Sequence, residues 1–485
     1  MTSNASDASL ADQVANVAVL QHGRTSLIDA VLQSIRERAH DLLRSEEQLI
    51  DELEVDRDMD HKLDFGKLVP APIYRLLPEL LSEVFKHAVR DLEYNCPWII
   101  YVVRILCNVC ATWRNVARAT PFLWTSIDLE YFKHGDNRLL PLQLDLSGCL
   151  PLEVFTSARR GNSPVPCLTP FFAELSDSDA AHIGCIRIVD DGFFLSRLAA
   201  RHLDGLRVAD IRVVDEYFPH ALNLLTHAPA LRDLSVTLNY DCKFFDVSEG
   251  FPIPQFPVFP CLTRLFLCFY THFPISAFIE TLSKYAPSLC EIRTEASINA
   301  DWEETRPTAI CDMPAMRTAV LDMYTHKLLV YISAPVLESV TLWVDRFCDS
   351  DPTDSLLDLL TRSRPPLRTF SLMDPLLGNA DTLERCLERM DGLRELRVTH
   401  IGYGETSSLR LAAMLRRLIC EEDKEAVLPE LRAFSLDFRD ANASALNSEV
   451  KPLVSLVRRS RRVPRVCVGR AVVALEEFHS NVDMS

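Results

Sequence analysis

The hydrophobic positions along this chain follow two different periods, one before residue 130 and another after it. Between residues 78 and 90 the apolar residues recur at steps of three and four, the spacing of one helix face. This apolar stripe consists of Leu80, Leu81, Val84, Phe85, Ala88 and Val89. Pro78 suits a first helical turn, so we expect a helix to begin there.

A second stretch of helical spacing begins near Ile99. Its apolar residues are Val102, Leu106, Val109, Trp113 and Val116. They predict one continuous helix, which should end at Thr120 because a residue before proline disfavours the helical conformation. Trp124 follows this break. A unit of about 55 residues buries little surface by itself, so we expect Trp113 and Trp124 to close the same small core.

The N-terminal residues carry weaker signals. Residues 1–20 are small and polar and predict a flexible tail, and residues 21–69 predict an amphipathic helix followed by a charged link. The helix is indicated by apolar residues at every seventh position, Ile28, Ile35, Leu42 and Leu49. Packing on the same chain is favoured over an intermolecular coiled coil, since the companion heptad positions are only partly apolar. The acidic run at 56–60 lacks the glycine of a calcium loop, so we predict no calcium site.

After residue 130 a short apolar phrase returns ten times. Eight copies resemble "PALRDLSV", and seven of these carry proline two residues before the first apolar position. With 28 prolines in 485 residues, composition would place one there about once in seventeen. The first apolar residues of the ten copies stand at positions 183, 208, 231, 262, 289, 316, 337, 367, 393 and 431.

The intervals between the copies run from 21 to 38 residues and average about 28. This period and the L-x-x-L-x-L pattern are typical of leucine-rich repeats, in which each repeat supplies one strand and a helix or loop. The stretches between the copies have helical spacing and predict the outer elements. We therefore expect a horseshoe-shaped α/β solenoid over residues 130–470 and a C-terminal tail over 471–485.

Composition and charge narrow the classes of function. Hydrophobic residues make up 48% and charged residues 25%, which is typical of a globular protein. The chain holds only 14 glycines and no G-x-S-x-G motif, which argues against phosphate-binding enzymes and hydrolases. A net charge of −17 disfavours nucleic acid as a partner. We expect no catalytic residues, no metal and no cofactor.

The 15 cysteines are irregularly spaced and no secretion signal precedes them, which predicts reduced thiols in the cytoplasm, the nucleus or both. Cys107 and Cys110 lack a second ligand pair and are expected to be ordinary core cysteines. No apolar run reaches the length of a membrane span. The basic run "RRSRRVPR" at 458–465 fits a solvated cap best, with an import or acidic-partner patch and nucleic-acid contact as alternatives.

The segments "RLLPELLSEVF" and "LCNVCATWRNVARATPFLWTSIDL" resemble the F-box and F-box-like domains, especially those of fungal proteins with irregular leucine-rich repeats. The first segment matches at Leu76, Pro78, Glu79, Leu81 and Phe85. The second matches at Cys110, Trp113, Arg114, Pro121, Leu123 and Trp124. The resemblance covers Ile73 to Leu129 and assigns residues 70–129 to an F-box-like domain, an all-α unit ahead of the solenoid.

The resemblance also implies a function. In that family the helices dock on a Skp-family adaptor, which links them to a cullin ubiquitin ligase, and the repeats present a protein substrate. Carried over to this chain, the adaptor-binding residues are Leu76, Pro78, Glu79, Leu81, Phe85 and Trp113. The chain would be a substrate-recruiting subunit of the ubiquitin conjugation pathway and not an enzyme. The alternative is a protein-binding scaffold whose F-box-like unit is only a structural cap.

The residues between the apolar positions of each strand should point away from the core and onto one face. This assigns to that face Asp233, Arg264, Phe266, Glu291, Arg293, Trp343, Glu395 and Arg397. Aromatic and guanidinium groups dominate the energetics of protein interfaces. Our candidates for substrate binding are therefore Phe266, Arg293, Trp343 and Arg397, with neither nucleic acid nor a membrane as partner.

Overall fold

The computed structural model describes much of the chain between Leu76 and Ser480. The described residues are 76–90, 99–129, 139–156, 171–172, 175–190, 202–213, 222–238, 255–269, 275–296, 309–343, 351–373, 380–400, 405–438 and 446–480. The chain divides into two compact units, Met1–Leu76 and Leu77–Ser485, and every described helix and strand belongs to the second. The predicted tail at 1–20, the helix and link at 21–69 and the rejected calcium loop lie outside the described residues.

Three short helices and one 3-10 turn come first. They are α2 (Pro78–Arg90), α3 (Ile99–Val109), α4 (Ala111–Arg118) and η4 (Pro121–Trp124). The prediction of one continuous helix from Ile99 was wrong, since the chain is extended at Cys110 with φ −162°. Cys110 is the N-cap of α4, and its Sγ accepts a hydrogen bond from the backbone N–H of Trp113 at 3.4 Å. The cap satisfies an otherwise orphan donor of the new helix.

A parallel sheet dominates the rest of the unit. It has thirteen strands within the described residues, in the order β1-β2-β3-β4-β5-β6-β7-β9-β11-β12-β13-β14-β17. The strands are β1 (Ser126–Asp128), β2 (Leu152–Phe155), β3 (Ile183–Asp190), β4 (Val208–Val213), β5 (Asp233–Leu238), β6 (Arg264–Phe269), β7 (Glu291–Ala296), β9 (Thr318–Asp322), β11 (Ser339–Trp343), β12 (Thr369–Met373), β13 (Glu395–His400), β14 (Ala433–Phe438) and β17 (Glu477–Ser480). The chain is therefore a mixed α/β protein with one large parallel sheet.

The repeated phrase of the sequence coincides with these strands. In each of the eight phrases from position 231 onward, the strand begins two residues after the first apolar residue. The apolar positions are buried, as Leu231 just before β5 and Leu234 and Val236 within it show. The phrase placed at Val208 was out of register by two residues. Leu206 is the buried equivalent of Leu231, because Ala209 pairs with Leu234 across the ladder.

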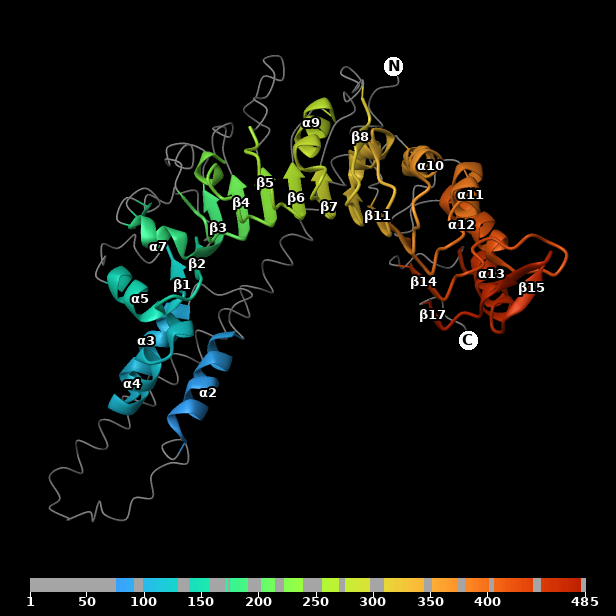
Figure 1. Cartoon of the computed structure of the whole chain (residues 1–485). Helices are drawn as coiled ribbons and strands as arrows, with labels where there is room; N and C mark the ends of the chain where they lie inside the picture. The colour runs from blue at the N-terminus through green and yellow to red at the C-terminus, as the bar shows by residue number, and fades with distance from the viewer. Residues whose placement is uncertain are drawn as a thin grey trace, which may run out of the picture. The chain divides into compact units, whose positions relative to one another are not determined.

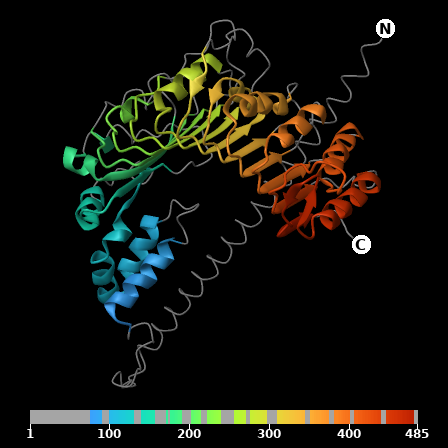
Figure 2. The same cartoon turned by 45° about the vertical axis from the view of Figure 1, so that its right-hand side comes forward.

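Helices cover one face of the sheet and leave the other to solvent or to other parts of the chain (Figures 1 and 2). They are α5 (Leu139–Ser147), α7 (Asp177–Ala181), α9 (Ile275–Tyr285), α10 (Pro352–Ser363), α11 (Ala380–Glu388), α12 (Glu405–Leu418) and α13 (Leu446–Ser460), with the 3-10 turns η6 (Asn223–Leu225) and η10 (Met323–Val330). Two small sheets complete the unit, β8 (Cys311–Asp312) with β10 (Ile332–Ser333), and a hairpin of β15 (Arg465–Cys467) and β16 (Arg470–Val472). We call the face that the described helices leave uncovered the open face.

Two predicted boundaries need correction. The sheet does not start after residue 130, because β1 follows η4 directly and pairs with β2. Residues 471–480 are not a tail, since β16 closes the hairpin and β17 pairs in parallel with β14. Strands β1 and β17 are short and lack the repeated phrase of the sequence. They are recognised as strands only by their pairing with β2 and β14.

In the basic run at 458–465, Arg458, Arg459 and Arg462 are exposed, as a solvated cap predicts, but Arg461 is not. Arg461 is fully buried, and its guanidinium donates to the carbonyl oxygens of Leu418 at 2.8 Å and Leu428 at 2.9 Å, and to that of Val427. These carbonyls belong to the end of α12 and the following loop. Arg461 therefore fastens α13 to its neighbour by hydrogen bonds, and burial lowers its pKa.

The structure predicts a pH effect on stability at His326. This side chain is buried in η10, where desolvation and then the charge of Lys327 lower its pKa to about 3, and Nδ1 lies 3.2 Å from Ser355 Oγ. The unfolded chain takes up a proton near the ordinary pKa of about 6.5, whereas the folded chain stays neutral. The neutral, buried His326 therefore makes its full contribution to the free energy of unfolding above about pH 6.5, and this contribution is lost as the pH falls. Urea unfolding measures the free energy of unfolding of wild type and of His326→Asn. The difference between these two values should shrink by roughly 1.4 kcal/mol per pH unit from about pH 6 to pH 4. A constant difference would contradict this assignment.

Candidate interaction surfaces

The helices α2 to α4 enclose a small core around aromatic side chains. The rings of Phe85 and Trp113 lie 5.0 Å apart between centroids. Trp124 is buried, and its indole N–H donates to the carbonyl oxygen of Ala117 at 2.9 Å. Thr120 Oγ1 donates to the Val116 carbonyl at 2.7 Å and lies 2.9 Å from Ser82 Oγ. Trp113 in the first turn of α4 thus packs against Phe85 of α2, whereas Trp124 packs at the other end of α4, beside Ala117.

The burial of these helices corrects part of the predicted adaptor site. Leu81 is only 2% exposed and Phe85 only 1%, so they build this core and offer no free surface. Trp113 is half-buried, and its Nε1 is enclosed without a hydrogen-bond partner among the described residues. Pro78 and Glu79 are exposed, as is Leu76 at the boundary of the first unit. The match to the family pattern could not separate core from surface positions, because both kinds are apolar.

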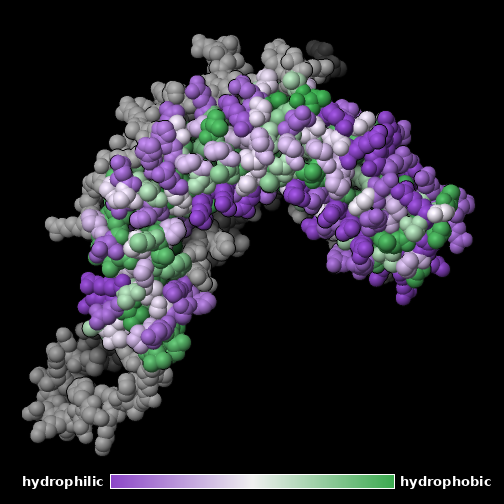
Figure 3. Space-filling model, in the orientation of Figure 1, coloured by the Kyte–Doolittle hydropathy of each residue, from purple (hydrophilic) through white to green (hydrophobic). Residues whose placement is uncertain are grey.

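A second apolar stripe on the same helices is exposed. It comprises Leu77 just before α2 and Leu80 and Val84 on α2, which are 63%, 52% and 45% exposed, and Ile105 and Val109 on α3. We call these five residues the outer stripe. Figure 3 shows several hydrophobic residues at the surface of this helical part. The sequence contains a signal for the outer stripe, because its residues also recur at steps of three and four, one position off the buried stripe.

The open face of the sheet carries the other predicted residues. Phe266 on β6 lies beside Arg293 on β7 in the ladder, and the Arg293 guanidinium lies 5.2 Å from the centre of the Phe266 ring. In the neighbouring row, Arg264 forms an ion pair with Asp233 at 2.5 Å. The hydrogen bond to Asp233 raises the pKa of Arg264. This part of the face is polar and mixed in charge, with one half-buried aromatic ring.

Trp343 and Arg397 lie in another part of the same face. Trp343 at the end of β11 is 45% exposed and neighbours Met373 of β12. Arg397 of β13 pairs with Glu395 at 2.5 Å. Strand β9 separates β7 from β11, and β12 separates β11 from β13. Phe266 and Arg293 are therefore neighbours, whereas Trp343 and Arg397 stand apart from them and from each other.

Metal-binding clusters and reactive thiols are two features that bear on catalysis. The described residues contain no group of three or more His, Cys, Asp or Glu side chains placed to hold a metal ion. Burial raises the pKa of the Cys185 and Cys386 thiols to about 12, so these cysteines stay protonated and unreactive near neutral pH. None of the described helices is both long enough and apolar enough to cross a membrane. What the geometry offers is two contact surfaces, the outer stripe and the open face.

The sequence reasoning missed a row of arginines along the sheet. In six of the repeats the residue directly after the first apolar position is arginine. These residues are Arg207, Arg232, Arg317, Arg368, Arg394 and Arg432. They lie at the edge where the strands begin, because their backbones continue the strand-to-strand hydrogen bonds. We call them the arginine column. The signal was present in the repeated phrase itself, as "LR" or "MR".

The helical core yields a stability prediction at Trp124. Replacing Trp124 by alanine removes a buried indole and its hydrogen bond to the Ala117 carbonyl, which keeps the Thr120 backbone N–H as a donor. We expect the free energy of unfolding to fall by about 3–5 kcal/mol. We also expect α2 to α4 to melt at a lower temperature than the sheet. Hydrogen exchange during thermal unfolding measures both. Trp343→Ala is the control, since its ring is half exposed and its removal should leave the helical part unchanged. Equal effects of the two changes would contradict the proposed core.

Comparison with known proteins adds no family to these surfaces. No family model matches the chain, and no curated protein matches it. Any function therefore has to be argued from the outer stripe, the open face and the arginine column.

Proposed function

We propose that this protein is a non-enzymatic adaptor subunit of the F-box kind. Its helices α2 to α4 would dock on a Skp-family adaptor of a cullin ubiquitin ligase, and its sheet, a leucine-rich-repeat solenoid in this proposal, would recruit a protein substrate. The cysteines that the structure describes are free thiols, which fits the reducing cytoplasm or nucleus, where that machinery works.

The observation that carries the proposal is the outer stripe. A helical unit that already has a closed core around Phe85 and Trp124 still exposes five large aliphatic side chains at α2 and α3. Soluble helices usually place polar residues on the face opposite their core. An aliphatic face of this kind is typical of a partner-binding surface. The position of the outer stripe within the segment that resembles the F-box supports a Skp-family adaptor as that partner.

The open face supports the second half of the proposal. A rigid parallel sheet presents regularly spaced side chains, which suits recognition of a partner better than catalysis. The exposed Trp343 and the Phe266–Arg293 pair are of the residue types that contribute most to protein interfaces. These side chains come from strands held in register by the ladder, so little ordering entropy is lost on binding.

One observation favours the alternative of a structural cap. The helical unit runs into the sheet without a linker, since Trp124 in η4 and Ile127 in β1 are both buried and α3 contacts β1. Helices so placed would cover the first strand of the sheet whether or not an adaptor binds. The two functions differ in one measurable property, the binding of the adaptor.

The first prediction concerns adaptor binding. Full-length protein expressed with a Skp-family adaptor should co-purify with it, and Leu80→Asp with Val84→Asp should reduce the recovered adaptor by more than about tenfold. Both side chains are about half exposed, so the charges should not unfold α2. By contrast, Leu81→Asp with Phe85→Asp should unfold the helical part, because both residues belong to its core.

A matched control is Leu456→Asp with Val468→Asp, which adds the same charges at exposed aliphatic residues far along the chain. This variant should keep the adaptor. If wild-type protein binds no adaptor, or if the Leu80 and Val84 variant binds it as well as wild type, the outer stripe is not a docking surface and the cap alternative stands.

The second prediction concerns substrate recruitment. Trp343→Ala and Arg397→Ala should each reduce capture of partner proteins from cell extract, measured by quantitative mass spectrometry. Adaptor recovery and melting temperature should stay nearly unchanged, because Trp343 is half exposed and the Arg397–Glu395 ion pair is exposed and weak. Arg385→Ala on α11, on the helix-covered side, is the control. Unchanged partner sets in both variants would exclude this part of the open face.

A further inference from the structure

The arginine column is a consequence of the ladder. The chain positions just before the strands are joined by consecutive backbone hydrogen bonds of 2.8 or 2.9 Å. In order along the sheet they are Gly184, Arg207, Arg232, Thr263, Cys290, Arg317, Glu338, Arg368, Arg394, Arg432 and Glu476. Arginine fills six of these eleven positions, whereas it makes up 42 of the 485 residues. The enrichment holds in a chain whose net charge is −17.

The densest part of the column lies at the start of β12, β13 and β14. Arg394 N–H donates to the Arg368 carbonyl and Arg432 N–H to the Arg394 carbonyl, so the three arginines stand on adjacent strands. Adjacent strands are about 4.8 Å apart, which places three guanidinium groups along roughly 10 Å. Like charges on neighbouring strands repel one another and destabilise the sheet. An anionic ligand would relieve that repulsion.

The charges of these three residues are only partly neutralised. All three are exposed, and Arg368 has no ion-pair partner among the described residues. Arg394 has Glu430 at 3.8 Å, and Arg432 donates to Glu476 at 2.8 Å. A guanidinium carries five N–H donors, so all three residues keep donors for a further acceptor.

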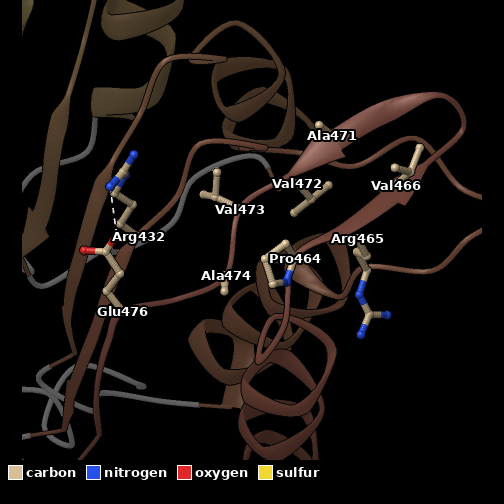
Figure 4. A pocket seen from close by; sticks show the side chains of 9 residues that line it. All are labelled: Arg432, Pro464, Arg465, Val466, Ala471, Val472, Val473, Ala474 and Glu476. Carbon is tan, nitrogen blue, oxygen red and sulfur yellow. Dashed lines mark hydrogen bonds and ion pairs between the residues drawn. The ribbon is translucent and has the colours of Figure 1, made fainter.

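A cavity lies where the column ends. Its volume is about 530 Å³, and Arg432 and Glu476 form one side of it (Figure 4). The hairpin of β15 and β16 supplies the other side, with Pro464, Val472 and Ala474 among mostly aliphatic lining residues. Arg465 also lines the cavity, and its Nε is buried without a hydrogen-bond partner among the described residues. The size lies within the ~300–1,000 Å³ of ligand pockets.

We propose that this edge and the cavity together bind an extended acidic segment of a partner protein. Its carboxylates would pair with Arg368, Arg394 and Arg432, and one aliphatic side chain beside them would enter the cavity. Side chains of an extended peptide repeat along one face every ~6.6 Å, so two or three carboxylates can reach the arginines of three adjacent strands. Guanidinium groups bind carboxylates with two parallel hydrogen bonds, which favours this pairing.

The surroundings favour a peptide over single-stranded nucleic acid. Binding of single strands relies on aromatic side chains for base stacking, and the cavity is lined by aliphatic and charged residues alone. Glu430 stands beside Arg394 and Glu476 beside Arg432, and both would repel a continuous phosphate backbone. A peptide can place its separate carboxylates away from them.

The assignment rests on the proposed function only in naming the bound segment as part of a substrate, because the binding itself needs no adaptor. The test uses full-length protein and fluorescence anisotropy with labelled peptides of about twelve residues. One peptide has alternating Glu and Ser around a central Leu. The second has Ser in place of Leu, and the third has Lys in place of Glu. A labelled oligouridylate of similar length is the nucleic-acid probe.

We expect the Glu peptide with Leu to bind, the Ser variant to bind at least about tenfold more weakly and the Lys peptide not to bind. Arg368→Glu with Arg394→Glu should weaken binding of the Leu peptide by more than about tenfold. Arg385→Glu on α11 with Arg389→Glu directly after it makes the same change in net charge on the helix-covered side and should leave binding unchanged. Adaptor recovery should be normal in both variants.

Four results would overturn the proposal. They are failure of the Glu peptide to bind, equal binding of the Glu and Lys peptides, equal weakening by both pairs of substitutions, and stronger binding of the oligouridylate than of the peptide. Loss of adaptor recovery in wild-type protein would instead refute the proposed ligase role and leave the peptide site standing, so the two failures are distinguishable.

Discussion

The continuous ladder of backbone hydrogen bonds between parallel strands is the constraint on which this structure depends. Each repeat sends two or three buried aliphatic side chains to one side of the sheet, as Leu231, Leu234 and Val236 do at β5. That spacing fixes the register, because a shift by one residue would move the apolar set to the open face. Once the register is fixed, equivalent positions of successive repeats lie side by side along the sheet. This alignment produces both the arginine column and the rows of side chains on the open face.

The same constraint explains why the surfaces differ in character. On the open face, charged residues stand beside opposite charges, as in the pairs Arg264–Asp233 and Arg397–Glu395. Exposed pairs of this kind contribute about 0–1 kcal/mol each to stability, so they shape recognition more than folding. At the edge where the strands begin, most of the charged side chains are arginines. Burial of the aliphatic core beneath them offsets the free-energy cost of their repulsion.

The helical part obeys a different rule. Two apolar stripes lie side by side on α2, and only one of them can face the core. Phe85 and Leu81 pack inward with Trp113 in reach, while Leu80 and Val84 remain outside. A helix that is apolar on more than half of its circumference is stable in water only if the rest of the protein or a partner covers the surplus. This feature connects the fold of α2 to α4 with the proposed adaptor.

In the sequence by itself, the repeated phrase located ten strands, with the copy at Val208 two residues out of register, since its apolar triplet has a period that only a stacked parallel arrangement buries fully. The sequence also indicated the residues that share the open face, but not that Trp113 and Trp124 would stand at opposite ends of α4. It could not decide which apolar stripe of α2 is buried, because Leu80 and Leu81 are chemically alike and only the contacts of α4 distinguish them. Cys110 as a cap, Arg461 as a buried donor and β17 as a strand also came from tertiary structure. Each depends on a partner 3 to 45 residues away in the chain, from Trp113 N–H for Cys110 to the β14 backbone for β17. Local sequence carries no record of such partners, so the tertiary structure had to supply them.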